Sequence, residues 1–237
     1  MRILKRPVDA VLVAILFVSI VAVLLGLEDP FFRNALFRRV NFPEWLYPQS
    51  WLKLLYDLGV GSFVSLFFYW LVVRIPEREK RKRIKRSFAN HYREFKEDCI
   101  QLMLSVADGS FEYGFHETLI DHKKFRAYFE QKVSTSQDRW DAFHNNLDGD
   151  QLQSLLRYME IFRDEIQFVL GSIDIPNDKP FVFLKRFSNA IALRKGTTLD
   201  YDSRKSFGNF LWEIFAGFSP VKGPLERDIV TVMISEM

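Results

Sequence analysis

Apolar residues fill two long stretches near the start of the chain. No charge interrupts positions 10–27, and a helix of that length rises about 27 Å, close to the roughly 30 Å of a bilayer's hydrocarbon core. Positions 54–73 are apolar except for Asp57, with Trp and Tyr near both ends, where interfacial aromatic residues are expected. The pattern predicts a hairpin of two transmembrane helices within residues 1–75, with spans at about 8–27 and 53–74 and an external loop at 28–52.

Basic residues predict how this hairpin is oriented. Arg2, Lys5 and Arg6 precede the first span, whereas the arginines of the loop are matched by acidic residues. Eight Lys or Arg side chains follow the second span within thirteen positions. By the positive-inside rule both ends of the chain are cytoplasmic. No small-x-small cleavage site follows the first span, so we interpret it as an uncleaved anchor in a multi-pass protein of the bacterial inner membrane.

The run at 76–86 forms a basic juxtamembrane collar. Its side chains are expected to contact anionic lipid head groups, at about 1 kcal/mol each. The collar residues are Arg78, Lys80, Arg81, Lys82, Arg83, Lys85 and Arg86.

A polar stripe crosses the second apolar stretch. Asp57, Gly61 and Ser65 follow one another at four-residue spacing and share one helix face. Small residues on such a face allow close packing, within the hairpin or between subunits. The other interpretation is that Asp57 lines a polar path, because ionisable groups in membrane segments are functional candidates.

A periodic pattern replaces the continuous one after Pro76. Apolar residues recur every three or four positions, which predicts one helix from Pro76 to Asp108, ended by Gly109. This apolar seam packs on its own domain or against a neighbouring subunit; it consists of Ile84, Phe88, Tyr92, Phe95, Cys99, Leu102 and Val106.

Similar patterns predict the remaining helices. Their expected ranges are 117–131, 137–146, 150–170 ended by Gly171, 178–196, about 200–217, and 225–236 opened by Gly223-Pro224. No long alternating run predicts a strand. The expected fold is therefore a membrane hairpin followed by an all-α cytosolic domain, 87–237, of about six helices.

Charge and cysteine content restrict the function. The pI is about 8.9, yet residues 87–237 hold 18 basic and 23 acidic side chains. The basicity belongs to the collar, so we expect no DNA or RNA polymer as a partner. Cys99 is the only cysteine, which rules out a disulfide within the chain and fits a reducing compartment.

No motif indicates catalysis. His91, His116, His122 and His144 form no pair with ligand spacing and are interpreted as surface or capping residues. Phosphate-binding glycine loops and nucleophile elbows are absent from the sequence. We expect no metal, no cofactor and no enzymatic activity.

One region of the acidic domain is locally basic. Basic groups beside a turn with hydroxyls and a stacking aromatic are suited to an anionic nucleotide. The alternative is a set of solvated helix faces and helix ends. This basic set consists of Lys185, Arg186, Arg194, Lys195, Thr197, Thr198, Tyr201, Arg204 and Lys205.

The layout of hairpin, collar and helical domain resembles that of bacterial antiphage membrane effectors. More narrowly, it is similar to type III CRISPR accessory membrane proteins whose cytosolic domain binds cyclic tetra-adenylate. The run 210–218 also resembles the ending of uncharacterised bacterial membrane proteins. The resemblance implies an oligomeric antiviral effector that binds a cyclic oligoadenylate and depolarises the membrane, with the helix from Pro76 to Asp108 transmitting the change. The alternative is a membrane-anchored protein-interaction module with no small ligand or pore.

Overall fold

The computed structural model describes residues 7–26 and 49–237, and they are mostly helical. The chain divides into two compact units, Met1–Lys80 and Arg81–Met237, which are described separately below. The expected helical fold class is confirmed at this level. The predicted external loop lies outside the described residues except at 49–52, where the structure has the start of a helix instead, and the basic residues before the first span also lie outside them.

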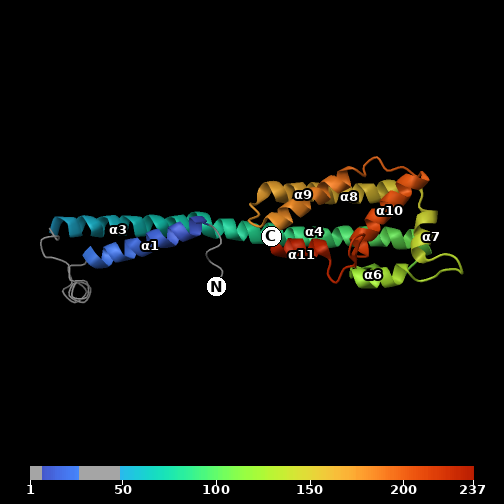
Figure 1. The fold of residues 1–237 in the computed structure, drawn as a ribbon, viewed down its shortest axis with the longest axis horizontal. Coiled ribbons are helices and arrows are strands. Elements are labelled where there is room, and N and C mark those ends of the chain that lie inside the picture. The colour runs from blue at the N-terminus through green and yellow to red at the C-terminus, as the bar shows by residue number, and fades with distance from the viewer. Residues whose placement is uncertain (1–6, 27–48) are drawn as a thin grey trace. The chain divides into compact units, whose positions relative to one another are not determined.

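The first unit contains two apolar helices that pack side by side. They are α1 (Pro7–Gly26) and α3 (Gln49–Tyr69), and α3 continues through η2 (Trp70–Arg74) into α4 (Ile75–Asp108) (Figure 1). In the described part of the chain, one helix, Lys53–Asp108, is long and apolar enough to cross a membrane, and Val11–Leu24 is a shorter apolar segment.

A π-helical turn separates α3 from α4. The Ile75 amide donates to the Trp70 carbonyl, five residues back, instead of four as in an α-helix. Such turns are frequently found at functional sites.

The long helix α4 supplies the first face of the second unit's core. Its predicted seam is buried at every position except Leu102, which is partly buried against the core. The interpretation that the seam packs on its own domain is therefore confirmed. The buried face is wider than the seam, because Ile100, Met103 and Leu104 are also inaccessible.

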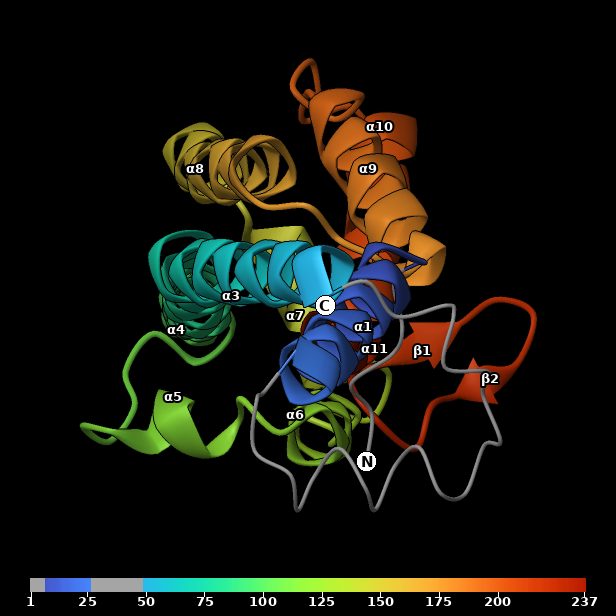
Figure 2. The ribbon, with the colours of Figure 1, turned by 90° about the vertical axis from the view of Figure 1, so that its left-hand side faces the viewer.

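Six further helices and one very short one complete this unit. In Figures 1 and 2, α8 lies along α4, and α9 lies beside α8. Asp or Asn side chains accept amide hydrogens at the first turns of most of these helices. The helices are α5 (Phe115–Thr118), α6 (His122–Phe129), α7 (Arg139–Asn146), α8 (Gly149–Ser172), α9 (Asp178–Ala192), α10 (Tyr201–Phe215) and α11 (Ile229–Glu236).

Four predicted elements differ from the structure. The helix expected at 178–196 ends at Ala192. The helix expected at 117–131 is two helices, α5 and α6, because Asp121 adopts an extended backbone and caps α6. Gly171 does not end its helix, which continues to Ser172. Gly223-Pro224 does not open a helix: it forms β2 (Gly223–Pro224), antiparallel to β1 (Phe218–Ser219), and α11 begins after Asp228 (Figure 2).

Aromatic rings fill the space between the helices of the second unit. Phe162 of α8 stacks on Phe95 of α4, with ring centroids 4.7 Å apart, and also contacts Phe88. Trp140 of α7 meets Trp212 of α10 at 4.9 Å. Each such pair adds about 0.5–1.5 kcal/mol beyond the burial of its area.

Candidate functional site

The predicted basic set is spread over α9, the following turn and the start of α10. Lys185 and Arg186 are exposed in the middle of α9, whereas Arg194 and Lys195 lie beyond its end. Arg204 and Lys205 lie in the first turns of α10.

Most polar groups at the turn already have partners. The Arg194 guanidinium lies 3.8 Å from the ring centre of Phe210, and its Nη1 donates to the Ala190 carbonyl at 2.9 Å. Lys195 forms an ion pair of 2.9 Å with Glu160 of α8. The Thr197 hydroxyl donates to the Arg194 carbonyl at 2.7 Å. These contacts fix the turn, and the buried Arg194 Nε is a donor there that has no hydrogen-bond partner.

Two further members of the set are also engaged. Thr198 donates to the Asp200 carboxylate, which lowers the pKa of Asp200 to about 2. An ionised carboxylate therefore stands within the basic set. Tyr201 is exposed, and Lys205 Nζ lies 5.8 Å from its ring centre, so a cation already covers the candidate stacking surface. This arrangement agrees better with solvated helix faces than with a nucleotide site.

The predicted polar stripe does not form the contact between α1 and α3. Asp57, Gly61 and Ser65 are all exposed, and a Cβ added to Gly61 would meet nothing within 4 Å. The close approach is made by Gly59, where a Cβ would lie 3.0 Å from the Ser19 carbonyl oxygen. The stripe is thus a separate face of α3 that the described residues leave exposed.

Two collar residues bind protein rather than solvent. Arg81 donates to the Met237 carbonyl, and Lys85 Nζ donates to the Ser235 carbonyl at 2.5 Å. Both acceptors lie at the end of α11, where a helix favours positive charge. Lipid contact by these two partly buried side chains stays a prediction, beside the contacts that they make with α11. The remaining collar residues are exposed: Arg78, Lys80, Lys82, Arg83 and Arg86.

A buried lysine joins α4 to α11. Lys96 is 1% exposed, and its ammonium lies 3.0 Å from the Asp228 carboxylate and 2.6 Å from the Ile120 carbonyl oxygen. Tyr92 also donates to Asp228, at 2.9 Å. Burial, followed by the charge of Asp228, raises the pKa of Tyr92 well above its usual value. The sequence pattern missed this network because a charged residue normally indicates an exposed position.

Only one of the four histidines matches its expected surface role. His91 is exposed and pairs with Glu94 at 3.1 Å. His122 is buried and bonds the Leu225 carbonyl, and His144 packs on Gly208, where an added Cβ would lie 1.8 Å from Cε1. His116 is partly buried, with Nδ1 lacking a hydrogen bond. Among the described residues, no His, Cys, Asp and Glu group could hold a metal ion.

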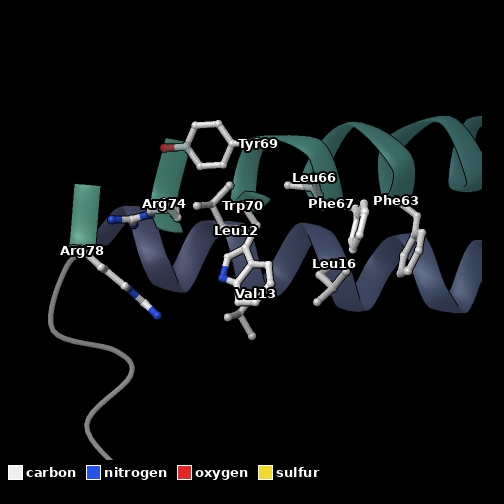
Figure 3. Close-up of a pocket in the computed structure, with 10 residues that line it drawn as sticks. All are labelled: Leu12, Val13, Leu16, Phe63, Leu66, Phe67, Tyr69, Trp70, Arg74 and Arg78. Carbon is white, nitrogen blue, oxygen red and sulfur yellow. The ribbon is translucent and has the colours of Figure 1, made fainter. Parts of the chain in front are cut away.

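An apolar groove with a basic end lies between α1 and α3. Its volume is about 340 Å³. Figure 3 shows the Trp70 indole between the two helices and the guanidinium groups of Arg74 and Arg78 at one end. The apolar wall consists of Leu12, Val13, Leu16, Phe63, Leu66, Phe67 and Tyr69.

A second groove, of about 140 Å³, lies between α4 and α8. Its floor is aromatic and its rim carries three carboxylates, those of Glu94, Asp98 and Glu165. Burial, followed by the charges of Glu97 and Glu94, raises the pKa of Asp98. Ile161 lines the groove and is 61% exposed. We call this feature the acidic groove.

Comparison with known proteins provides no relative from which a function could be transferred. No known family, curated protein or solved structure matches this chain.

Proposed function

We propose that the chain is a membrane-anchored protein-interaction module. Its apolar hairpin lies in the bilayer, and its helical domain binds a protein partner on the cytoplasmic side through the acidic groove. The proposal has a membrane part and a recruitment part, and each has its own support.

The apolar surface of the hairpin carries the membrane part. Phe17 and Leu58 are 68% and 67% exposed, and most large apolar side chains exposed in the described residues belong to this unit. Burying one such side chain is worth about 1.5–3 kcal/mol. In water this surface would be strongly unfavourable, whereas hydrocarbon would cover it without cost. The 20 residues of α1 also suit a span, at about 30 Å.

Charge and shape together support recruitment at the acidic groove. Ile161 and Phe168 are exposed seven residues apart on α8, so they share one helix face with Glu165 between them. A partner suited to this surface is an amphipathic segment that presents Lys or Arg beside an apolar side chain. Such segments commonly dock as helices in grooves.

A site-specific crosslinker at the groove tests recruitment in cells. A benzoylphenylalanine at Ile161 is expected to trap one discrete partner, and the same group at Val221, which is 91% exposed in a loop, serves as the control. The triple change Glu94→Gln, Asp98→Gln and Glu165→Gln should abolish the Ile161 adduct. Equal adducts from both positions, or none at Ile161, would reject the groove as a docking surface.

Resistance of the full chain to alkaline carbonate extraction tests the membrane part separately. The chain is expected to remain with the membrane fraction. Recovery in the soluble fraction would reject the anchor whatever the crosslinker shows.

An oligomeric antiviral effector is a second proposal, supported by the exposed stripe of Asp57, Gly61 and Ser65. Several hairpins packing through this face would place carboxylates around a shared path. A cyclic oligoadenylate is expected to shift such an assembly only through different affinities for its two states. Titrating the purified full chain with cyclic tetra-adenylate tests the ligand, and loss of membrane potential on triggering tests the pore. An Asp57→Asn variant should suppress depolarisation without changing membrane insertion.

A further inference from the structure

The groove between α1 and α3 has the chemistry of a phospholipid site. We propose that it holds one glycerophospholipid of the cytoplasmic leaflet, with an acyl chain along the apolar wall and the phosphate at Arg74 and Arg78. This inference rests on the proposed membrane anchor and adds a specific ligand to it.

The order of residues along the groove follows the order of chemical groups in a lipid. Phe63 and Phe67 line the apolar part, Trp70 follows, and Arg74 and Arg78 form the end (Figure 3). Trp prefers the level of the head groups, and arginine binds phosphate through paired N–H donors. Side chains suited to hydrocarbon, to the interface and to phosphate therefore follow one another along one side of the helix.

The length of the groove fits one leaflet. Phe63 and Arg74 are eleven residues apart, which is about 16 Å along a helix. Half of a hydrocarbon core of about 30 Å is about 15 Å. A lipid whose phosphate lies at Arg74 would thus reach the bilayer midplane near Phe63.

Trp70 and Arg74 bring both chemistries to the groove. Trp70 and Arg74 are the first and last residues of η2, and both line it. In a regular α-helix, residues four apart differ by about 40° in direction. In the π turn the two positions likewise lie about one turn apart, so the indole and guanidinium groups face the same groove.

Charge favours an anionic lipid. Both guanidinium groups are positively charged, so they attract an anionic head group and repel the trimethylammonium group of phosphatidylcholine. The expected preference is for phosphatidylglycerol over phosphatidylcholine.

Native mass spectrometry of the full chain in mild detergent tests the site. The chain is expected to retain one phosphatidylglycerol. The pair Arg74→Gln and Arg78→Gln should weaken retention about a hundredfold or more, since two charged hydrogen bonds of about 1.5–3 kcal/mol each are lost. The control pair Arg83→Gln and Arg86→Gln removes the same charge from exposed collar positions and should change retention less than about twofold.

A groove-filling variant gives a readout that does not depend on charge. Leu16 lines the same wall, so the larger side chain of Leu16→Trp should displace the lipid while both arginines remain. Equal loss in the two arginine pairs would show general attraction to anionic lipid and overturn the site. Retention of the lipid by Leu16→Trp would also overturn the site. A disulfide between two copies of the Phe67→Cys variant would do the same, because it would show that a second copy covers the groove.

The outcome also separates this inference from the proposed anchor. A chain that resists carbonate extraction but retains no phospholipid contradicts only the lipid site. A chain recovered in the soluble fraction contradicts the anchor itself.

Discussion

The ion pair between Lys96 and Asp228 should stabilise the domain asymmetrically. The lysine side chain is 2% exposed and the aspartate side chain 14%. Removing one partner of a buried pair costs about 3–5 kcal/mol, because the other charge stays buried without compensation. The size of the loss therefore depends on which partner remains.

Asp228→Asn isolates the charge of the aspartate. Asparagine caps helices as well as aspartate does, so the bonds from the Val230 and Thr231 amides can remain. Lys96 then keeps the Ile120 carbonyl and the Tyr92 ring but no counter-charge, and we expect the free energy of unfolding to fall by about 3 kcal/mol or more.

Lys96→Met should cost less. It leaves Asp228 partly exposed, with the Tyr92 hydroxyl and two backbone amides still donating to it. The ammonium's two hydrogen bonds, to Asp228 and to the Ile120 carbonyl, are lost, so we expect a loss of about 2 kcal/mol, at about 1 kcal/mol for each bond. The double variant removes both charges and should be close to Lys96→Met alone, because no charge is then left buried without compensation.

Urea unfolding of the full chain in detergent, followed by circular dichroism at 222 nm, measures these differences. With a slope of about 1–3 kcal/mol per molar urea, a loss of 3 kcal/mol moves the midpoint by about 1–3 M. Equal shifts in the two single variants would refute the reasoning, as would a double variant less stable than Asp228→Asn.

Three further predictions concern the core. Gly208→Ala should lower the free energy of unfolding by about 1–3 kcal/mol, because the new methyl group collides with His144, and adding His144→Ala should restore the stability. As the control, Gly171→Ala adds a methyl group that meets nothing and should be neutral or stabilising in the same urea assay. Burial raises the pKa of Cys99 well above its usual value, so its thiol should resist maleimide at pH 8 until urea unfolds the chain. The raised pKa of Tyr92 predicts stability that is complete below about pH 10 and declines as pH rises further; an unchanged urea midpoint at pH 11 would contradict this.

Periodicity predicted the elements of this fold better than their contacts. The seam of α4 is buried because its spacing matches the helix repeat. Lys96 lies on the same face, but its partner Asp228 is 132 residues away, and no local pattern connects them. Spacing likewise identified Gly61 as part of a stripe, yet only the position of α1 determines that Gly59 is the contact.

In the candidate sites, too, closeness in the sequence did not predict which residues are in contact. The basic set is close in sequence, but Lys195 meets Glu160 on another helix, which sequence distance could not indicate. Conversely, the acidic groove combines Glu94 and Glu165 from helices far apart in the chain. Their exposure and the apolar floor beneath them become visible only after α8 packs on α4.

The π turn at η2 also bears on how this helix tolerates changes in length. One turn of the helix takes about five residues there, instead of about four as in an α-helix. The segment therefore behaves as a local insertion of one residue. Deleting one residue between Trp70 and Arg74 should restore regular geometry and leave the flanking faces in phase. A deletion elsewhere in the helix should turn one flank by about 100° relative to the other. Chains related to this one that lack a residue in this helix are thus expected to carry the gap at 70–74.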